Sequence, residues 1–208
     1  MTADEVAGGA TTIDVRQLVL VNDLAELGMS GVADNLGLLA GERAEMDVRR
    51  THFVEVADIP EHVDDDVRLG VRVRLRDIPG GHVLVLFPEE SAQTITRLLL
   101  SEVVQQGTDV SSEMARSAVE ELGNMMASGF VDGWADVLGT SIDISTPQLV
   151  YAPAGEIVER TAGLADDRLA LIFDSDITVP GQEIEAEIYA FPEIEGFVRV
   201  INALDSQS

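Results

Sequence analysis

The segment from Ser111 to Gly139 reads SSEMARSAVEELGNMMASGFVDGWADVLG, and its apolar residues recur at intervals of three and four. At about 100° per residue, these intervals put one set of apolar side chains on a single helix face. The set is Val119, Leu122, Met126 and Phe130. Serine suits a helix start and glycine suits the position after a helix end. We therefore expect one long helix from Ser111 or Ser112 to about Leu138, with this face toward the core.

A polar stripe follows the opposite side of the same helix. It consists of Ser117, Glu121, Asn124 and Ser128, which fall within a band about 60° wide. Gly123 and Ala127 lie beside the stripe and are small, so we expect that another molecule can approach the helix closely there. Asparagine and glycine are poor helix formers in a helix interior, so their presence favours a role other than stability. A solvated helix face is the plain alternative for the stripe taken alone.

The chain repeats its landmarks in the same order at a spacing of roughly a hundred residues, which indicates a duplication. The landmarks are Glu-Leu-Gly at 26–28 and 121–123, Pro-Gly at 79–80 and 180–181, and Phe-Pro-Glu at 87–89 and 191–193. Each half alone would bury little apolar surface. We therefore expect a single domain over 1–208, built from half-repeats at about 13–106 and 111–204.

Both halves predict the same order of elements: a long helix, three strands and a closing helix. In the first half these are a helix at 13–39, strands at 45–56, 68–76 and 82–87, and a helix from 88 to about 105. In the second half they are the helix at 111–138, strands at 141–151, 168–177 and 184–191, and a helix ending near 204. The predicted fold is α/β of the α+β type. Two long helices pair on one side of a shared, largely antiparallel sheet.

The charge is strongly one-sided, with 38 acidic residues against 13 basic ones and a formal net charge of −25. All 13 basic residues are arginine, so the chain has no lysine, and it also has no cysteine. An acidic, lysine-free surface is typical of a protein from a salt-accumulating, halophilic cytoplasm. It argues against nucleic acid as a partner. Missing lysine and cysteine exclude a Walker A loop, a Schiff base, disulfides and a thiol nucleophile.

Other features bound the location and the chemistry. The first ten residues lack the basic and apolar regions of a signal peptide, and no stretch is long enough for a membrane span. We therefore expect a cytoplasmic protein without a membrane partner. The three histidines, His52, His62 and His82, are scattered without metal-ligand spacing, so we expect no metal site.

The long helix also carries a specific spacing. Ser117 is followed after three residues by Glu121, after two more by Asn124, and after twenty-two more by Pro147. This pattern resembles the signature of the CheC/CheX/FliY family of chemotaxis phosphatases, and the duplicated architecture is similar to CheC over nearly the whole chain. The resemblance implies the same position for the signature: a long helix followed by a strand that contains Pro147.

The resemblance implies hydrolysis of the aspartyl-phosphate of a CheY-like response regulator. Asn124 would then hold the attacking water in line with phosphorus, and Glu121 would pair with a lysine of the regulator. Ser117, Ser128 and Pro147 would be docking residues. The regulator would bring its own Mg²⁺, so the phosphatase needs no cofactor.

The first half departs from the two-site members of that family. One register places Glu26 and Met29 at the Glu and Asn positions, and another places Asp23 and Glu26 there. Neither gives Glu-x-x-Asn, and Arg49 or His52 stands where a proline would be needed. We therefore interpret Asp23, Glu26 and Met29 as a degenerate first site, which leaves a single site on the second long helix.

Two other functions stay open from the sequence. One is a non-catalytic binding module, either an adaptor for the receptor deamidase CheD or a relative of FliM and FliY that recognises CheY only. The other is an unrelated duplicated α/β binding domain with an accidental stripe. An Asn124 side chain buried in the core would favour the latter.

Overall fold

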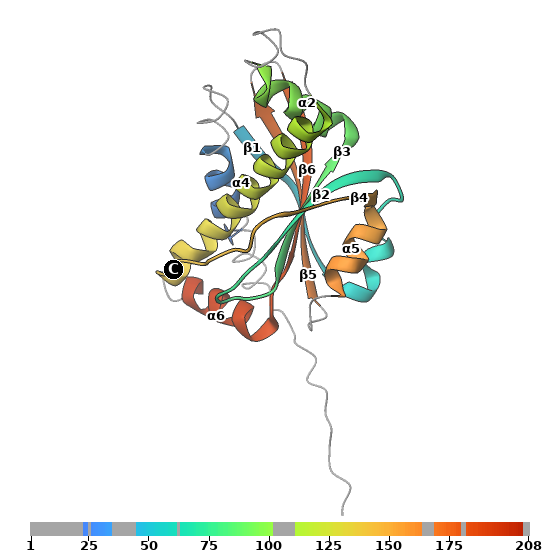
Figure 1. The fold of residues 1–208 in the computed structure, drawn as a ribbon. Coiled ribbons are helices and arrows are strands. Elements are labelled where there is room, and N and C mark those ends of the chain that lie inside the picture. Colours follow the sequence, from blue (N-terminus) through green and yellow to red (C-terminus); the bar gives the residue numbers. More distant parts are fainter. Residues whose placement is uncertain are drawn as a thin grey trace, which may run out of the picture.

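The computed structural model describes residues 23–24, 26–34, 45–61, 63–101, 111–163, 169–179 and 182–205. The strands are β1 Glu45–Glu55, β2 Val67–Arg74, β3 His82–Pro88, β4 Gln148–Pro153, β5 Leu169–Val179 and β6 Gln182–Phe191. The helices are η1 Val56–Glu61 (a 3-10 helix), α2 Glu89–Leu99, α4 Ser112–Leu138, α5 Ala154–Ala162 and α6 Ile194–Asp205. Residues 26–34 are helical as well and are called the first helix below. Figure 1 shows these elements packed around one sheet.

The strand order β1-β5-β6-β3-β2-β4 reflects the duplication of the chain, and every pair of neighbouring strands is antiparallel. Exchanging β1 with β4, β2 with β5 and β3 with β6 gives the same order read backwards. The pseudo-twofold axis therefore passes between β3 and β6, which pair from His82↔Phe191 to Leu86↔Glu187. This arrangement confirms the predicted fold of two repeats that share one antiparallel sheet.

The repeated turn and helix-start signals act as predicted. Gly80 and Gly81 have φ angles of 77° and 91°, which suit glycine, and they close the β2–β3 hairpin. Pro88 then caps α2, with acidic Glu89 and Glu90 in its first turn. Acidic side chains are favourable there because the helix start is electropositive. The second Pro-Gly, at 180–181, lies outside the described residues.

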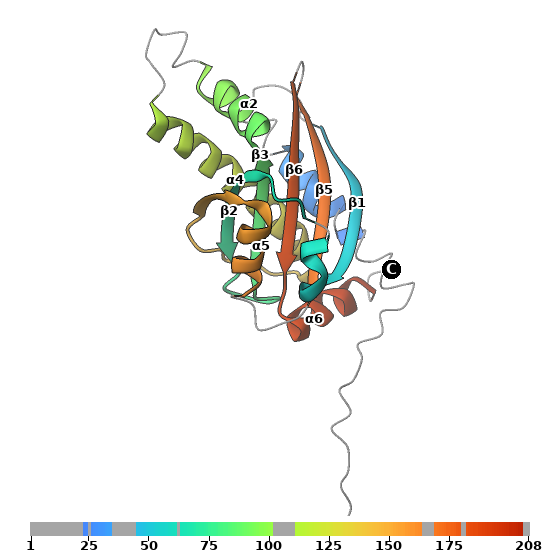
Figure 2. The same ribbon diagram turned by 90° about the vertical axis from the view of Figure 1, so that its right-hand side faces the viewer.

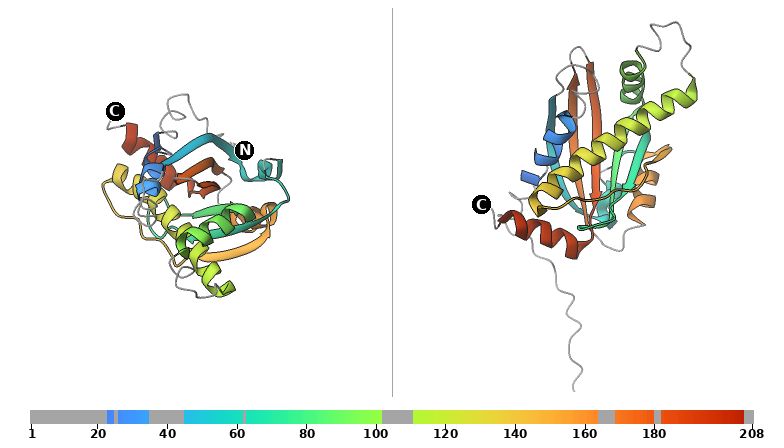
Figure 3. Two further views of the ribbon diagram at one scale, coloured as in Figure 1. Left: turned by 90° about the horizontal axis from the view of Figure 1, so that it is seen from above. Right: turned by 60° about the vertical axis from the view of Figure 1, so that its left-hand side comes forward.

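The sheet has a thickly covered face and a partly covered face. The larger core lies between the sheet and α2, α4, α6 and the first helix, and it contains Val71, Val85, Phe130, Trp134 and Phe173. On the other face a smaller core gathers under α5 and η1. Figure 2 looks onto this second face, where parts of β1, β5 and β6 have no helix in front of them. The right-hand view of Figure 3 shows α4 crossing the first face diagonally, with the first helix beside it.

Glycine brings α4 and the first helix into backbone contact. A Cβ added to Gly133 would lie 2.6 Å from the backbone nitrogen of Gly28, and one added to Gly129 would lie 2.7 Å from that of Val32. From the other side, a Cβ on Gly31 would lie 2.8 Å from the Gly129 carbonyl oxygen. No larger residue fits at these positions without moving a helix. The described part of the first long helix therefore pairs with α4 as predicted.

The predicted strand at 141–151 is wrong in its first part. Only Gln148–Pro153 form β4, although the preceding segment also runs along β2, through the Leu75↔Ile144 bridge. Ser145 donates its backbone N–H to the Arg74 carbonyl, and its Oγ accepts from the Arg74 N–H. Pro147 follows and has no N–H to give to the ladder, so regular pairing resumes one residue later. Pro147 thus precedes the strand instead of lying in it.

Two helices and one boundary also differ from the sequence prediction. Neither η1 nor α5 was predicted, although Ala154, Ile157, Val158, Thr161 and Ala162 are buried at helical spacing. That apolar stripe was a readable signal, and Pro153 precedes it in the N-cap position. Helix α2 ends at Leu99, earlier than the predicted end near residue 105.

The close contact between α4 and the first helix predicts that alanine at Gly133 destabilises the protein, whereas alanine at a glycine outside the contact does not. Gly133→Ala should lower the free energy of unfolding by about 1–3 kcal/mol, because the new methyl meets the backbone of Gly28. Gly155→Ala is the matched control, since its methyl would meet only Asp65 Oδ1, at 3.7 Å. The control should be neutral or gain about 0.5–1 kcal/mol from helix propensity. Urea unfolding of both variants measures this, and a Gly133→Ala variant as stable as its control would refute the contact.

Candidate functional site

Helix α4 is defined at both ends by its sequence. The Ser111 Oγ accepts a hydrogen bond from the Met114 N–H at 3.2 Å, and this bond satisfies one of the free donors of the first turn. At the other end Gly139 takes the left-handed conformation, with φ 62°. These caps confirm the predicted bounds of the helix. They place Ser117 to Ser128 in its first two-thirds, well inside regular structure.

The packing of α4 points the polar stripe outward. Val119, Leu122, Met126 and Phe130 are all buried, as predicted. On the other side Ser117 and Glu121 are exposed, while Asn124 and Ser128 are half-buried. Asn124 therefore lies outside the core. A buried Asn124 would have favoured an accidental stripe, and the structure does not have one. The four side chains share one accessible helix face.

The expectation that Gly123 and Ala127 leave room for another molecule is wrong. Both are buried, and a Cβ added to Gly123 would overlap the side chain of Val71 on β2. The missing side chain at Gly123 therefore lets α4 lie directly on the sheet. Together with Gly129 and Gly133 against the first helix, it shows that these glycines serve internal packing. A partner could reach the stripe because its side chains lie on the side of α4 that faces away from the sheet.

Pro147 precedes β4, in which Leu149 lies on the side of the sheet that α4 covers. Side chains alternate along β4, and Leu149, two residues after Pro147, packs against the core beneath α4. Leu149 pairs with Val71, the residue on which Gly123 rests. Pro147 is half-buried, and its place beside the stripe stays a prediction.

The charged and amide groups of the stripe are available to a partner. Within the part of the chain that the structure describes, neither Glu121 nor Asn124 makes a side-chain hydrogen bond or ion pair. Beyond the stripe toward the helix end, burial and the neighbouring carboxylate of Asp136 raise the pKa of Asp132. Residues 125–131, which separate Asn124 from Asp132 along the helix, are all uncharged.

The first helix offers no equivalent pair among its described residues. Met29 is 2% exposed and belongs to the core. Asp23 and Glu26 are both exposed, so the accessible groups at these positions are carboxylates. An anionic phosphate would be repelled by them. That Asp23, Glu26 and Met29 form a degenerate first site stays a prediction.

A second acid with a raised pKa, Glu187, lies on the opposite face of the sheet. Burial raises the pKa of Glu187, against the opposing effects of a hydrogen bond from Tyr189 and the nearby charge of Arg68. Tyr189 donates its hydroxyl to Glu187 Oε2 at 2.6 Å, and burial raises the pKa of that hydroxyl as well. Arg68 is held by Asp64 at 2.8 Å. Perturbed groups often mark functional sites, but this cluster sits under the α5 layer, away from the stripe.

Comparison with known proteins identifies the family. A model of the CheC-like family matches residues 114–151, the segment that runs from α4 through Pro147 into β4. A relative from Halobacterium salinarum is 41% identical over 195 residues, which span 94% of this chain and all of the relative. The chain belongs to the CheC-like family. The relative's name describes it, provisionally, as a CheY-P phosphatase, CheC1.

A second relative and two solved structures are more distant. CheC of Bacillus subtilis, named a CheY-P phosphatase, is 22% identical over 202 residues, covering 92% of this chain and 95% of its own. FliY of Thermotoga maritima superposes with a TM-score of 0.77 at 13% identity, over 95% of this chain and 100% of FliY. The FliM middle domain of Vibrio alginolyticus gives 0.61 at 10% identity, over 87% and 99%. These likenesses confirm the CheC-like fold.

No helix among the described residues is long and apolar enough to span a membrane. Within the same residues, no three histidine, aspartate or glutamate side chains are grouped so that they could hold a metal ion.

The buried carboxyl of Glu187 predicts a pH-dependent gain on neutralisation. A raised pKa means that folding disfavours the charged form, so the penalty is fully present above the raised pKa and absent below the ordinary value of 4.5. Glu187→Gln should therefore stabilise the protein at pH 7, and the gain should vanish toward pH 4. Glu185→Gln, on the same strand but exposed, is the control. Thermal unfolding across this range measures both, and a Glu187→Gln variant that gains less over wild type at pH 7 than at pH 4 would contradict the effect.

Proposed function

We propose that this CheC-like protein hydrolyses the aspartyl-phosphate of a CheY-like response regulator through one site, Glu121 and Asn124 on α4. The observation that supports the proposal best is the outward, unpaired presentation of these two side chains on a regular helix. The names of two relatives, both given as CheY-P phosphatases, support the same substrate class.

The chemistry asks little of the phosphatase. An aspartyl-phosphate is an activated acyl phosphate, and water attacks phosphorus while the regulator's aspartate leaves as a carboxylate. The phosphoryl group needs in-line positioning of that water and neutralisation of its oxygens. The Asn124 amide offers a donor and an acceptor in one plane, which is suited to orienting water. Mg²⁺ held by the regulator supplies the positive charge, so the phosphatase itself contributes no cofactor.

Glu121 has a docking role on this proposal. It precedes Asn124 by three residues, so both project from the same side of α4. Among the described residues, Glu121 has no ion-pair partner. A lysine beside the regulator's phosphorylated aspartate is therefore the natural partner, and pairing would bring Asn124 to the phosphorus. Ser117, Ser128 and Pro147 surround this contact and complete the docking surface.

A binding-only function is the second candidate. The fold is shared with FliM domains, and the first helix presents carboxylates where a second active pair would stand. Such a module would bind CheY or the deamidase CheD without accelerating phosphate loss. Docking through Glu121 would be common to both functions, so binding alone does not separate them, whereas the role of Asn124 does.

The decisive measurement is the decay of a ³²P-labelled CheY-like regulator in molar KCl with Mg²⁺, with and without this protein. Wild type should accelerate the decay, and Asn124→Ala should remove most of the acceleration, on the order of 100-fold, because the water loses its in-line position. Glu121→Gln should weaken regulator binding. Glu120→Gln, the neighbouring half-buried glutamate, is the matched control and should behave as wild type.

Each result has a definite meaning, provided that the variants unfold at the wild-type temperature. Acceleration retained in Asn124→Ala would refute the proposed site. A folded wild type that binds the regulator without accelerating decay would refute the phosphatase and establish the binding function. A defect in Glu120→Gln equal to that of Glu121→Gln would refute a specific docking role for Glu121.

A further inference from the structure

Tyr151 is unlike every other aromatic side chain whose burial the structure describes. The aromatic side chains that are buried are Phe87, Phe130, Trp134, Phe173, Tyr189, Phe191 and Phe197. Tyr151 is 62% exposed, the largest exposure among the described large hydrophobic residues. In so acidic a chain with few aromatic residues, a solvated ring on an edge strand has no packing role. Exposed aromatic residues of this kind are enriched at protein interfaces.

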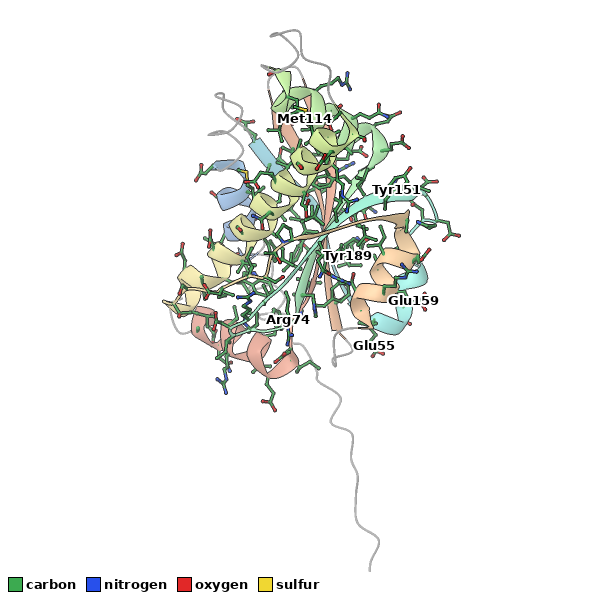
Figure 4. The ribbon with its side chains drawn as sticks, in the orientation of Figure 1. Glu55, Arg74, Met114, Tyr151, Glu159 and Tyr189 are labelled. Carbon is green, nitrogen blue, oxygen red and sulfur yellow. The ribbon has the colours of Figure 1, made fainter. Side chains whose placement is uncertain are left out.

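The position of Tyr151 connects it with the Glu121/Asn124 site. Along β4, Leu149 and Tyr151 point to the same side of the sheet, and the packing of Leu149 shows that this is the side covered by α4. Leu149 pairs with Val71, on which Gly123 rests, and Tyr151 stands two residues farther along the strand. Figure 4 shows Tyr151 near the end of β4, the edge strand of the sheet.

A second exposed apolar residue lies beside it. Val67 is 40% exposed and shares the α4 side of β2 with Leu69, two residues away. Leu69 is the cross-strand partner of Tyr151, so Val67 and Tyr151 are diagonal neighbours. Five large hydrophobic residues are exposed in the described chain, and two of them meet at this corner. We call Tyr151 and Val67 the apolar corner.

We infer that the apolar corner is a further docking contact for the phosphorylated regulator, which it would hold while Glu121 and Asn124 engage the phosphorylation site. The inference rests on the proposed function for its partner. Continuity carries it: the corner lies on the side of the sheet that α4 covers, and Leu69, the partner of Tyr151, is two residues from Val71, on which Gly123 of α4 rests. A regulator docked on α4 with its phosphate at Asn124 extends over this edge, where it meets an aromatic ring.

The ionic conditions give the corner a distinct role. In molar salt the Debye length falls to about 3 Å, so an exposed pair between Glu121 and a lysine is weakened. The net charge of −25 also opposes a phosphorylated partner whenever salt is low. Burial of an aromatic ring is not screened by salt. The corner therefore supplies affinity that salt does not weaken.

The test separates binding from chemistry. The regulator is fixed in its activated form with beryllofluoride, which mimics the acyl phosphate, and titrated with each variant in about 2 M KCl, where charged contacts are screened. Tyr151→Ala should raise Kd and the KM of dephosphorylation about ten-fold, while kcat changes less than about two-fold. Tyr151→Phe should bind like wild type because the ring is kept. Val67→Ala should weaken binding, and Val198→Ala is its matched control, since Val198 is 41% exposed on α6.

The outcomes distinguish this inference from the proposed function. Wild-type Kd and KM in Tyr151→Ala, with activity still dependent on Asn124, would overturn the docking contact and leave the phosphatase intact. Equal weakening by Val67→Ala and Val198→Ala would also overturn it, because the effect would not belong to the corner. If the regulator binds and Tyr151→Ala weakens binding, the contact stands, even where no variant or wild type accelerates decay.

Discussion

Backbone contact through glycine sets the position of α4, and every surface feature of the site depends on that position. Gly129 and Gly133 press against the first helix, and Gly123 rests on Val71 of β2. These contacts fix the rotation of α4 about its axis as well as its height above the sheet. A helix interior with three glycines gives up roughly 1 kcal/mol for each relative to alanine. Close packing offsets that loss, and it leaves the Ser117–Ser128 face outward.

The helix, the repeats and the outward stripe could be predicted from the sequence because each has a local signature. Periodicity gives the buried face of α4, and Phe-Pro-Glu marks both closing helices. The role of Gly123 could not be found in this way, since its reason is Val71, which lies far earlier in the chain. The place of Pro147, in contrast, was readable, since proline has no N–H for the ladder and regular pairing begins one residue later, at Gln148. Helix α5 also had a readable stripe.

A symmetric fold carries an asymmetric surface. The strand order is its own reverse, and both long helices lie on one face of the sheet. Packing constrains the inner sides of both helices, through Phe130 on one and Met29 on the other. The outer sides are free of that constraint, so one could keep an amide while the other acquired carboxylates without any cost to the core. Loss of one site is therefore compatible with an unchanged fold.

The distribution of acid along α4 is consistent with an anionic ligand at Asn124. The chain has 38 acidic residues, yet none lies between Glu121 and Asp132 on this helix. Halophilic surfaces gain solvation from acid, and the half-buried Asn124 and Ser128 are positions where an acid would have been tolerated sterically. A carboxylate at Asn124 would repel a phosphoryl group and its attacking water alike. Neutral side chains there leave a gap in the negative surface of the helix, and Glu121, which can pair with a lysine, borders it.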